Sequence, residues 1–275
     1  ATHEMTAIGW VAMTLSMFGV GGASINLGHE LGHKTDWKRR KASVFALGLA
    51  GLPHFSIEHN RGHHKHVATP EDPASSRLGE TYFQFMCREM PGTWKRGWAL
   101  EKERLAKKGH GFWHTENEIL QASAVTVVLW SIIVGLYGAA MLPFLAVTTF
   151  LGHTTLTSAN YVEHYGLLRD KLDNGKYEPP KPKHSWNQNY LSSNLMQFQL
   201  QRHSDHHAHP TRSYQCLRHF DNVPQLPASY FVMFLIASVP PLWFKIMDPK
   251  VMAWADGDLS KINMTDAKRA ELEAA

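Results

Sequence analysis

Positive charge is missing from three long stretches of this sequence, and this segregation most constrains how the chain can fold. No Lys or Arg occurs in residues 1–33, 119–168 or 219–244. Uncharged apolar stretches of this length are typical of membrane-spanning helices, and basic loops collect on the cytoplasmic side of a bilayer. We therefore expect an all-α, polytopic membrane helical bundle whose basic loops share one side. Of the 28 basic residues, 23 fall in 34–41, 58–118 and 163–218.

Three apolar segments are long enough to cross a bilayer as helices, at about 1.5 Å per residue. They cover residues 5–27, 119–142 and 144 to about 162, and the last two form an antiparallel pair with a tight turn at Pro143. With the basic loops inside, three spans place Ala1 outside. We therefore expect further spans upstream of this sequence.

Two other apolar segments contain prolines that interrupt a helix. Residues 43–57 include Pro53, and residues 226–244 include the adjacent pair Pro240 and Pro241. We expect both segments to dip into the membrane or to lie at its interface. The expected domain organisation is one membrane-embedded domain over 1–260 and a polar tail or linker over 261–275.

Composition excludes several other kinds of protein. The net charge is +4, but the basic residues are spread over loops without the basic and aromatic modules that bind nucleic acid, so we expect no nucleic-acid partner. Cys87 and Cys216 are too few for a cysteine-ligated iron–sulfur cluster or a four-cysteine zinc site. We expect both cysteines to be free thiols.

Histidine is abundant, and its grouping carries the chemistry. The 18 histidines include the runs HELGH, HNRGHHKH and HSDHHAH, with one more in NYVEHYGL. Spacings of three or four residues put two imidazoles on one helical face, where both can reach one metal ion. Because each run adjoins an apolar segment or a basic loop, we expect them to converge at the membrane–cytosol boundary. The spacing pairs His29 with His33, His59 with His63, and His203 with His206 and His207.

So many histidines exceed the needs of one tetrahedral zinc ion, so two metal ions are implied. Imidazole binds iron, copper and zinc, and ligand type alone does not select the element. Carboxylates near the histidines would accept the second ring N–H of a metal-bound imidazole, although a solvated surface charge is an equal alternative for Glu58. The carboxylates expected in the supporting role are Glu30, Asp72, Glu163 and Asp205.

Four runs together resemble the integral-membrane alkane monooxygenases, the bacterial alkane hydroxylases that oxidise a terminal methyl group. The resemblance extends from about Ile8 to Leu259, and the long second and fourth runs are more specific than a bare HxxxH pattern. Members of that family usually have six spans, three more than this sequence contains. The runs are HELGHK at 29–34, EHNRGHHKHVATPEDPASSR at 58–77, NYVEHYGLLR at 160–169 and LQRHSDHHAHPTRSYQCLR at 200–218.

The resemblance implies a fold related in plan to membrane fatty-acid desaturases and hydroxylases, in the bacterial inner membrane, with two non-haem iron ions near the cytoplasmic face. It implies a medium-chain n-alkane as substrate, dioxygen as co-substrate, and electrons from rubredoxin, rubredoxin reductase and NADH. His66 and His209 fall outside the family's ligand pattern. The implied iron ligands are His29, His33, His59, His63, His64, His164, His203, His206 and His207.

A polar stripe follows the expected helix 144–162. His153, Thr157, Asn160 and His164 lie near one helical face, with Phe150 and Thr154 beside it. Polar side chains in a membrane helix face a cavity or another helix rather than lipid. We expect Phe150, His153, Thr154 and Thr157 to line a hydrocarbon channel and Asn160 to support the metal site.

Three alternatives stay open. The first keeps the membrane di-iron site but makes the enzyme a fatty-acyl desaturase or an aromatic side-chain monooxygenase. The second is an intramembrane zinc protease, which explains His29, Glu30 and His33 but leaves the other histidine runs without a role. The third is a metal transporter or sensor, for which the uncharged spans offer no ion path.

Overall fold

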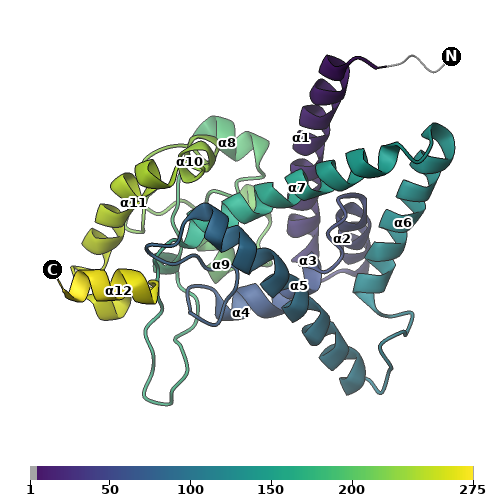
Figure 1. Cartoon of the computed structure of the whole chain (residues 1–275). Helices are drawn as coiled ribbons and strands as arrows, with labels where there is room; N and C mark the ends of the chain where they lie inside the picture. Colours follow the sequence, from purple (N-terminus) through teal and green to yellow (C-terminus); the bar gives the residue numbers. More distant parts are fainter. Residues whose placement is uncertain (1–4, 275) are drawn as a thin grey trace. The chain divides into compact units, whose positions relative to one another are not determined.

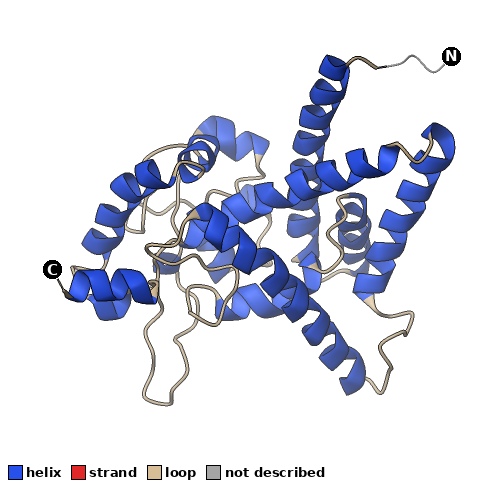
Figure 2. Cartoon of the chain, in the orientation of Figure 1, coloured by secondary structure: helices blue, strands red, loops and turns tan. Residues whose placement is uncertain are grey.

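The computed structural model describes residues 5–274, and this part of the chain consists of helices and loops without a β-strand (Figure 2). The expectation of an all-α fold is confirmed. Contacts divide the chain into two compact units. Unit 1 comprises the residues up to Ile57 together with Trp98–Leu156, and unit 2 comprises Glu58–Gly97 together with the residues from Thr157 onward.

The long helices carry most of the fold, and short helical turns position the histidines. The long helices are α1 (Ala7–Gly32), α2 (Trp37–Leu49), α5 (Tyr82–Lys107), α6 (Glu118–Tyr137), α7 (Met141–His164) and α11 (Pro240–Trp254). The shorter α-helices are α3 (Phe55–Glu58), α4 (His64–His66), α8 (Leu191–Met196), α9 (His203–Ala208), α10 (Tyr230–Ala237) and α12 (Asp266–Glu273). A π-helical turn, η1, covers His59–His63, and 3₁₀ turns cover Pro182–His184 (η2), Tyr214–Cys216 (η3) and Leu259–Lys261 (η4).

In unit 1, α2 lies between α1 and α6 (Figure 1). Side-chain caps define where these helices begin: Asp36 accepts a hydrogen bond from the backbone N–H of Arg39 at 3.0 Å, and Asn117 caps α6 in the same way. The helices approach closely at glycines. The Ser43 hydroxyl donates to the carbonyl of Gly28, and the Thr126 hydroxyl donates to the carbonyl of Gly48 at 2.6 Å.

Within the described residues 5–274, two helices, α1 and α6, are long and apolar enough to cross a membrane. The pair α10 and α11 would form a third span if counted as one, although it is bent by 119°. The bend lies immediately before Pro240, where the adjacent prolines predicted a break, and Pro240 and Pro241 then begin α11. The bent pair fits the expectation of a re-entrant or interfacial element.

The prediction of a span over 144–162 is not supported. A continuous helix, α7, does form there, but it is not among the helices apolar enough to cross a membrane. Threonine, histidine and asparagine side chains along it lower its hydropathy below that of α1 and α6. The turn before it is also earlier than predicted, at Gly138, whose φ of +89° favours glycine. Pro143 lies within the first turn of α7, where proline is tolerated.

Unit 2 packs around a cluster of aromatic side chains. Tyr161, Tyr165 and Trp243 are fully buried, with the rings of Tyr161 and Trp243 4.9 Å apart. The buried hydroxyls have partners, because Tyr161 donates to the carbonyl of Glu80 at 2.7 Å and Tyr165 donates to Asp248 at 2.9 Å. These bonds fix the C-terminal half of α7, which ends at a histidine.

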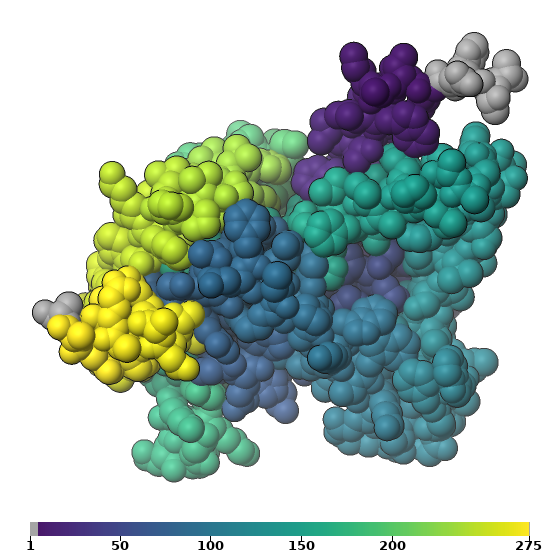
Figure 3. Space-filling view, in the orientation of Figure 1, coloured from purple at the N-terminus to yellow at the C-terminus, as the bar shows by residue number. Residues whose placement is uncertain are grey.

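The core of unit 2 extends past the expected domain end at residue 260. Ile262 and Met264 are buried in it, and the backbone N–H of Thr265 donates to the carbonyl of Leu78 at 3.0 Å. Figure 3 shows the C-terminal residues, in yellow, bordering the blue residues of the same unit. Residues 262–265 therefore attach α12 to unit 2.

The close approach of α2 and α6 gives a test of the packing in unit 1. A Cβ added at Gly48 would lie 2.6 Å from the Cβ of Val125 and 2.7 Å from the carbonyl oxygen of Ala122. Because relieving this overlap requires the backbone to shift, Gly48→Ala should destabilise the protein by about 1–3 kcal/mol. Thermal unfolding in detergent, followed by circular dichroism, measures this. Gly135→Ala on α6 is the matched control, because its Cβ meets nothing within 4 Å, and it should leave the midpoint unchanged or slightly raised.

Candidate metal centre

Unit 2 gathers four histidines that are distant in sequence into one buried group. His63, His164, His203 and His207 each offer a ring nitrogen, and these nitrogens all lie within 4.8 Å of one another. The side chains come from η1, the end of α7, and α9. We call this set the four-histidine group.

Two rings in the four-histidine group have one nitrogen held and the other nitrogen without a hydrogen-bond partner. His63 Nδ1 lies 2.8 Å from Asp72 Oδ2, and His164 Nδ1 lies 3.3 Å from the carbonyl oxygen of His184. The Nε2 atoms of His63 and His164 are buried and have no hydrogen-bond partner. An acceptor on one nitrogen fixes the tautomer that leaves the other nitrogen's lone pair for a metal. The observed arrangement therefore fits a metal ion.

The other two members, His203 and His207, lie one turn apart on α9. Their Nε2 atoms are 2.8 Å apart, and Glu163 Oε2 lies 3.1 Å from His203 Nε2. Asp205, on the same helix, accepts hydrogen bonds from the Arg218 backbone N–H at 2.9 Å and from the Arg218 guanidinium at 2.8 Å. Asp205 thus attaches α9 to the loop that follows it.

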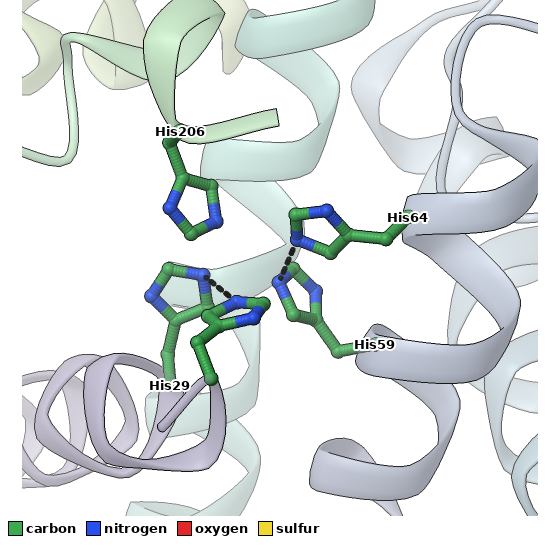
Figure 4. A group of neighbouring side chains, drawn as sticks. His29, His59, His64 and His206 are labelled. Carbon is green, nitrogen blue, oxygen red and sulfur yellow. Dashed lines mark hydrogen bonds between the residues drawn. The ribbon is translucent and has the colours of Figure 1, made fainter. Parts of the chain in front are cut away.

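A second set, which we call the three-histidine group, consists of His59, His64 and His206. Their rings point toward one another (Figure 4), with His59 Nε2 and His64 Nε2 3.0 Å apart and the rings of His64 and His206 5.0 Å apart. The two groups adjoin, since the rings of His64 and His207 are 4.3 Å apart. Unit 2 therefore holds two neighbouring groups of imidazoles.

The π-helical turn explains how one short segment supplies both groups. A π-helix bonds residue i to i+5, so His59 and His64 share a face, whereas His63 turns toward the four-histidine group. The rings of His59 and His63, which the spacing pairs, lie stacked with centroids 5.1 Å apart, while their ring nitrogens belong to different groups. On α9 the i,i+4 pair His203 and His207 stays together, and His206 joins the three-histidine group.

In unit 1, the HELGH run lies at the end of α1. His29 Nε2 and His33 Nε2 are 3.3 Å apart. Glu30, between them in sequence, forms an ion pair with Lys34 at 2.7 Å. The helical i,i+4 spacing thus brings these two imidazoles together as expected.

Two of the three Nε2 pairs have the separation that one chelated ion requires. Two nitrogens each ~2.1 Å from an ion are roughly 3.0–3.4 Å apart for angles between square and tetrahedral. The separations are 3.3 Å for His29 and His33 and 3.0 Å for His59 and His64, whereas His203 and His207 are slightly closer, at 2.8 Å. The donors are all imidazoles, which suit iron, copper, nickel and zinc.

A buried cluster of charged side chains contacts His63 through Asp72. The Arg96 guanidinium donates to Glu58 Oε1 and, at 2.7 Å, to Asp72 Oδ1. Burial alone would raise the pKa of Asp72, but His63 and Arg96 hold that pKa well below its usual range. Burial raises the pKa of Glu58, and the charge of Arg96 opposes this increase. Asp72 is therefore a carboxylate at neutral pH and accepts the His63 ring N–H.

One sequence interpretation changes here. Glu58 is 2% exposed, so the alternative that it is a solvated surface charge is wrong. Arg96, which the sequence did not single out, forms ion pairs with Glu58 and Asp72. The separation in sequence between Arg96 and the histidines does not predict this contact. Only in the folded chain does α5 place Arg96 next to Glu58 and Asp72.

The four residues predicted to line a channel are described with the partners that they have in each unit. Thr157 donates to Glu89 Oε2 at 2.8 Å in unit 2, and Asn160 donates to Glu89 Oε1 at 3.2 Å. In unit 1, the Thr154 hydroxyl donates to the Leu151 carbonyl, and the His153 ring lies 6.0 Å from the His54 ring. Phe150 is 50% exposed. The channel assignment remains a prediction.

A third set of donors, in the loop between α5 and α6, was not singled out from the sequence. His110, His114 and Glu116 lie close together, with the two rings stacked 3.7 Å apart. The set is partly exposed, and Glu116 forms an ion pair with Lys108 at 2.6 Å. The backbone N–H of Glu116 donates to His114 Nδ1, so this ring nitrogen accepts a hydrogen bond. In unit 2, by contrast, the Nδ1 atoms of His63 and His164 lie against acceptors.

Comparisons with known proteins agree with the geometry. Residues 5–237 match the fatty acid desaturase family. An alkane 1-monooxygenase of Pseudomonas putida is 52% identical over 270 residues, which are 98% of this chain and 67% of that protein. An alkane 1-monooxygenase of Ectopseudomonas oleovorans is 50% identical over 268 residues, with the same coverage. The xylene/toluene monooxygenase hydroxylase component of Pseudomonas putida is 30% identical over 84% of this chain and 61% of that protein.

The hydrogen bond between Asp72 and His63 can be tested by metal content. Asp72→Asn keeps the size of the side chain but removes the charge that accepts the His63 ring N–H and pairs with Arg96. Loss of such a support weakens metal affinity by about 10–100-fold. Titration with a chelator, with bound metal counted by mass spectrometry, should show release at lower chelator concentration. The exposed Asp173→Asn is the control, and equal retention by both variants would contradict the role of Asp72.

Proposed function

We propose that this chain, which belongs to the alkane 1-monooxygenases of the fatty acid desaturase family, hydroxylates the terminal methyl group of a medium-chain n-alkane. The observation that carries the proposal is the pair of histidine groups in unit 2, in which His63 and His164 keep buried nitrogens for a metal. The product is a primary alcohol, and dioxygen is the co-substrate.

The reaction selects the metal. A methyl C–H bond has neither an acidic proton nor an electrophilic carbon, so acid–base groups alone cannot open it. Zinc has no redox chemistry, whereas iron has, and imidazole binds both. We propose two non-haem iron ions, which supply dioxygen activation when bound. His29 and His33 are proposed to join the seven histidines of unit 2 as ligands, since their nitrogens have the same chelating separation.

The protein's own residues then position the metals and exclude water. Asp72 and the carbonyl of His184 orient His63 and His164, and Glu163 lies beside His203. Burial lowers the pKa of His207, and neighbouring imidazoles lower it further, so that this ring stays neutral and able to bind metal. Orientation and a dry surrounding are the protein's contribution to oxygen chemistry of this kind.

Electrons must come from outside the chain. The sequence has no GxGxxG fingerprint for a flavin or nicotinamide and too few cysteines for an iron–sulfur cluster. We propose rubredoxin as the direct donor, reduced by rubredoxin reductase and NADH. The exposed basic residues would favour a small acidic partner. We also propose the bacterial inner membrane as the location, with the metal site near the cytoplasmic face.

Product analysis tests the reaction and separates it from its relatives. The iron-loaded membrane protein, given octane, dioxygen, rubredoxin, its reductase and NADH, should form 1-octanol, measured by gas chromatography. A variant with His64→Ala is the inactive control. An alkene from a fatty-acyl substrate would indicate a desaturase, and a benzylic alcohol from xylene in preference to octanol would indicate an aromatic side-chain monooxygenase. Either result without octanol overturns the proposal.

Metal stoichiometry tests the ligand set and the remaining rivals. His29→Ala and His64→Ala should each lower bound iron and alcohol formation together, because each removes one imidazole of a chelating pair. His66→Ala should retain both, since this ring is partly exposed and lies 3.0 Å from Glu71. One zinc ion and no iron per chain would instead favour the intramembrane protease. Full iron in His29→Ala would remove α1 from the ligand set.

A further inference from the structure

Glu89 is a buried carboxyl group that the metal site as described leaves without a role. It lies on α5 and is 1% exposed. Oε2 accepts a hydrogen bond from the Thr157 hydroxyl at 2.8 Å, and Oε1 accepts one from the Asn160 amide at 3.2 Å. Both partners are neutral, and no Lys or Arg of the described chain forms an ion pair with Glu89. A buried carboxylate without a cation is costly, which is why such groups tend to hold a proton.

The positions of these partners connect Glu89 to the four-histidine group. Thr157, Asn160 and His164 are spaced i, i+3 and i+7 along α7, so they follow one face of the helix. On α5, Glu89, Thr93 and Arg96 are spaced i, i+4 and i+7 and are likewise on one face. Arg96 reaches Asp72, which holds His63. Glu89 thus shares a face of α5 with Arg96 and hydrogen-bonds to the face of α7 that carries His164.

The charged groups around Glu89 favour its protonated form. Burial raises the pKa of Glu89 to about 7, and the negative charges of Glu58 and Asp72 act in the same direction. The hydrogen bonds from Thr157 and Asn160 oppose this increase. The neighbouring cation Arg96 forms its ion pairs with Glu58 and Asp72. From α7, the titratable group on the same face is His164, one turn beyond Asn160.

We propose that Glu89 holds a proton and delivers it, through the polar face of α7 formed by Thr157 and Asn160, to the reaction at the four-histidine group. The inference rests on the proposed function. Hydroxylation of RH by dioxygen takes two electrons and two protons, and yields ROH and one water. The electrons come from the external one-electron donor. The protons must enter a site whose four imidazoles are buried, and Glu89 is a buried carboxyl group that hydrogen-bonds to α7, the helix that ends at His164.

A purely structural role is the alternative, in which Glu89 only ties α5 to α7 by two hydrogen bonds. Glu89→Gln separates the two roles, because glutamine keeps the shape and can still accept a hydrogen bond but cannot release a proton. Glu89→Asp keeps the carboxyl on a shorter side chain. Glu103→Gln, on an exposed turn of the same helix, is the matched control.

The first measurement does not depend on turnover. Infrared spectroscopy of the purified protein, titrated with acid and base, should show the C=O band of a protonated carboxyl that disappears as pH rises through about 7. The component that titrates near 7 should be missing from Glu89→Gln and present in Glu103→Gln, whereas the buried Glu163, whose pKa burial raises to about 8, contributes its own component in every variant. If Glu89→Gln retains the component near 7, Glu89 is not the group that holds the proton, and the inference fails whatever the substrate is.

The second measurement is the pH profile of alcohol formation. Because the protonated form is the donor, wild-type turnover should fall as pH rises above about 7. Glu89→Gln should lower kcat at neutral pH by at least about tenfold and should abolish this pH dependence. It should also consume more NADH per alcohol formed. Its iron content and its thermal midpoint should be unchanged. Glu89→Asp should restore part of the rate with a shifted profile. A Glu89→Gln variant with wild-type rate and profile overturns the inference alone, whereas absence of alcohol from the wild-type protein overturns the proposed function.

Discussion

The structure depends on the hydrogen-bond acceptors that orient its buried imidazoles. Each ring has two nitrogens, and fixing one as a donor to an outer acceptor makes the other a metal-binding lone pair. Asp72 does this for His63, and the backbone carbonyl of His184 does it for His164. The acceptor on His63 would itself be an unstable buried charge without Arg96, which also neutralises Glu58. The histidines are therefore the inner layer of a cluster whose outer layer is ionic.

Secondary structure decides how the histidines are shared between two sites. A regular α-helix over 59–64 would place His59 and His63 together and would leave His64 about 140° away from His59 around the helix axis. The π-helical turn places His59 with His64 instead and directs His63 to the other group. On α9 the ordinary helical turn keeps His203 with His207. One irregular turn and one regular turn thus give two adjacent sets.

The sequence predicted the parts that depend on local spacing and composition. It located the histidine runs, the two apolar helices α1 and α6, and the break before Pro240, because these follow from helical periodicity, hydropathy and proline geometry. It could not predict what depends on segments meeting in space. Arg96 and Glu89 lie among ordinary helical residues of α5, and only the packing of α5 on the other parts of unit 2 gives them partners. The π-helical turn was also beyond prediction, since its residues suit an α-helix equally well.

Two buried acids, Asp72 and Glu89, show how neighbouring environments can hold different charge states. Asp72 has two charged or charge-assisted partners, His63 and Arg96, so its ionised form is stabilised despite burial. Glu89 has two neutral partners, and its own ionisation would add a negative charge near Glu58 and Asp72. A second arginine beside Glu89 would remove this difference and fix a second permanent carboxylate. Because α5 presents Thr93 one turn from Glu89 and Arg96 two turns away, the helix keeps its cation with Asp72 and leaves Glu89 able to exchange a proton.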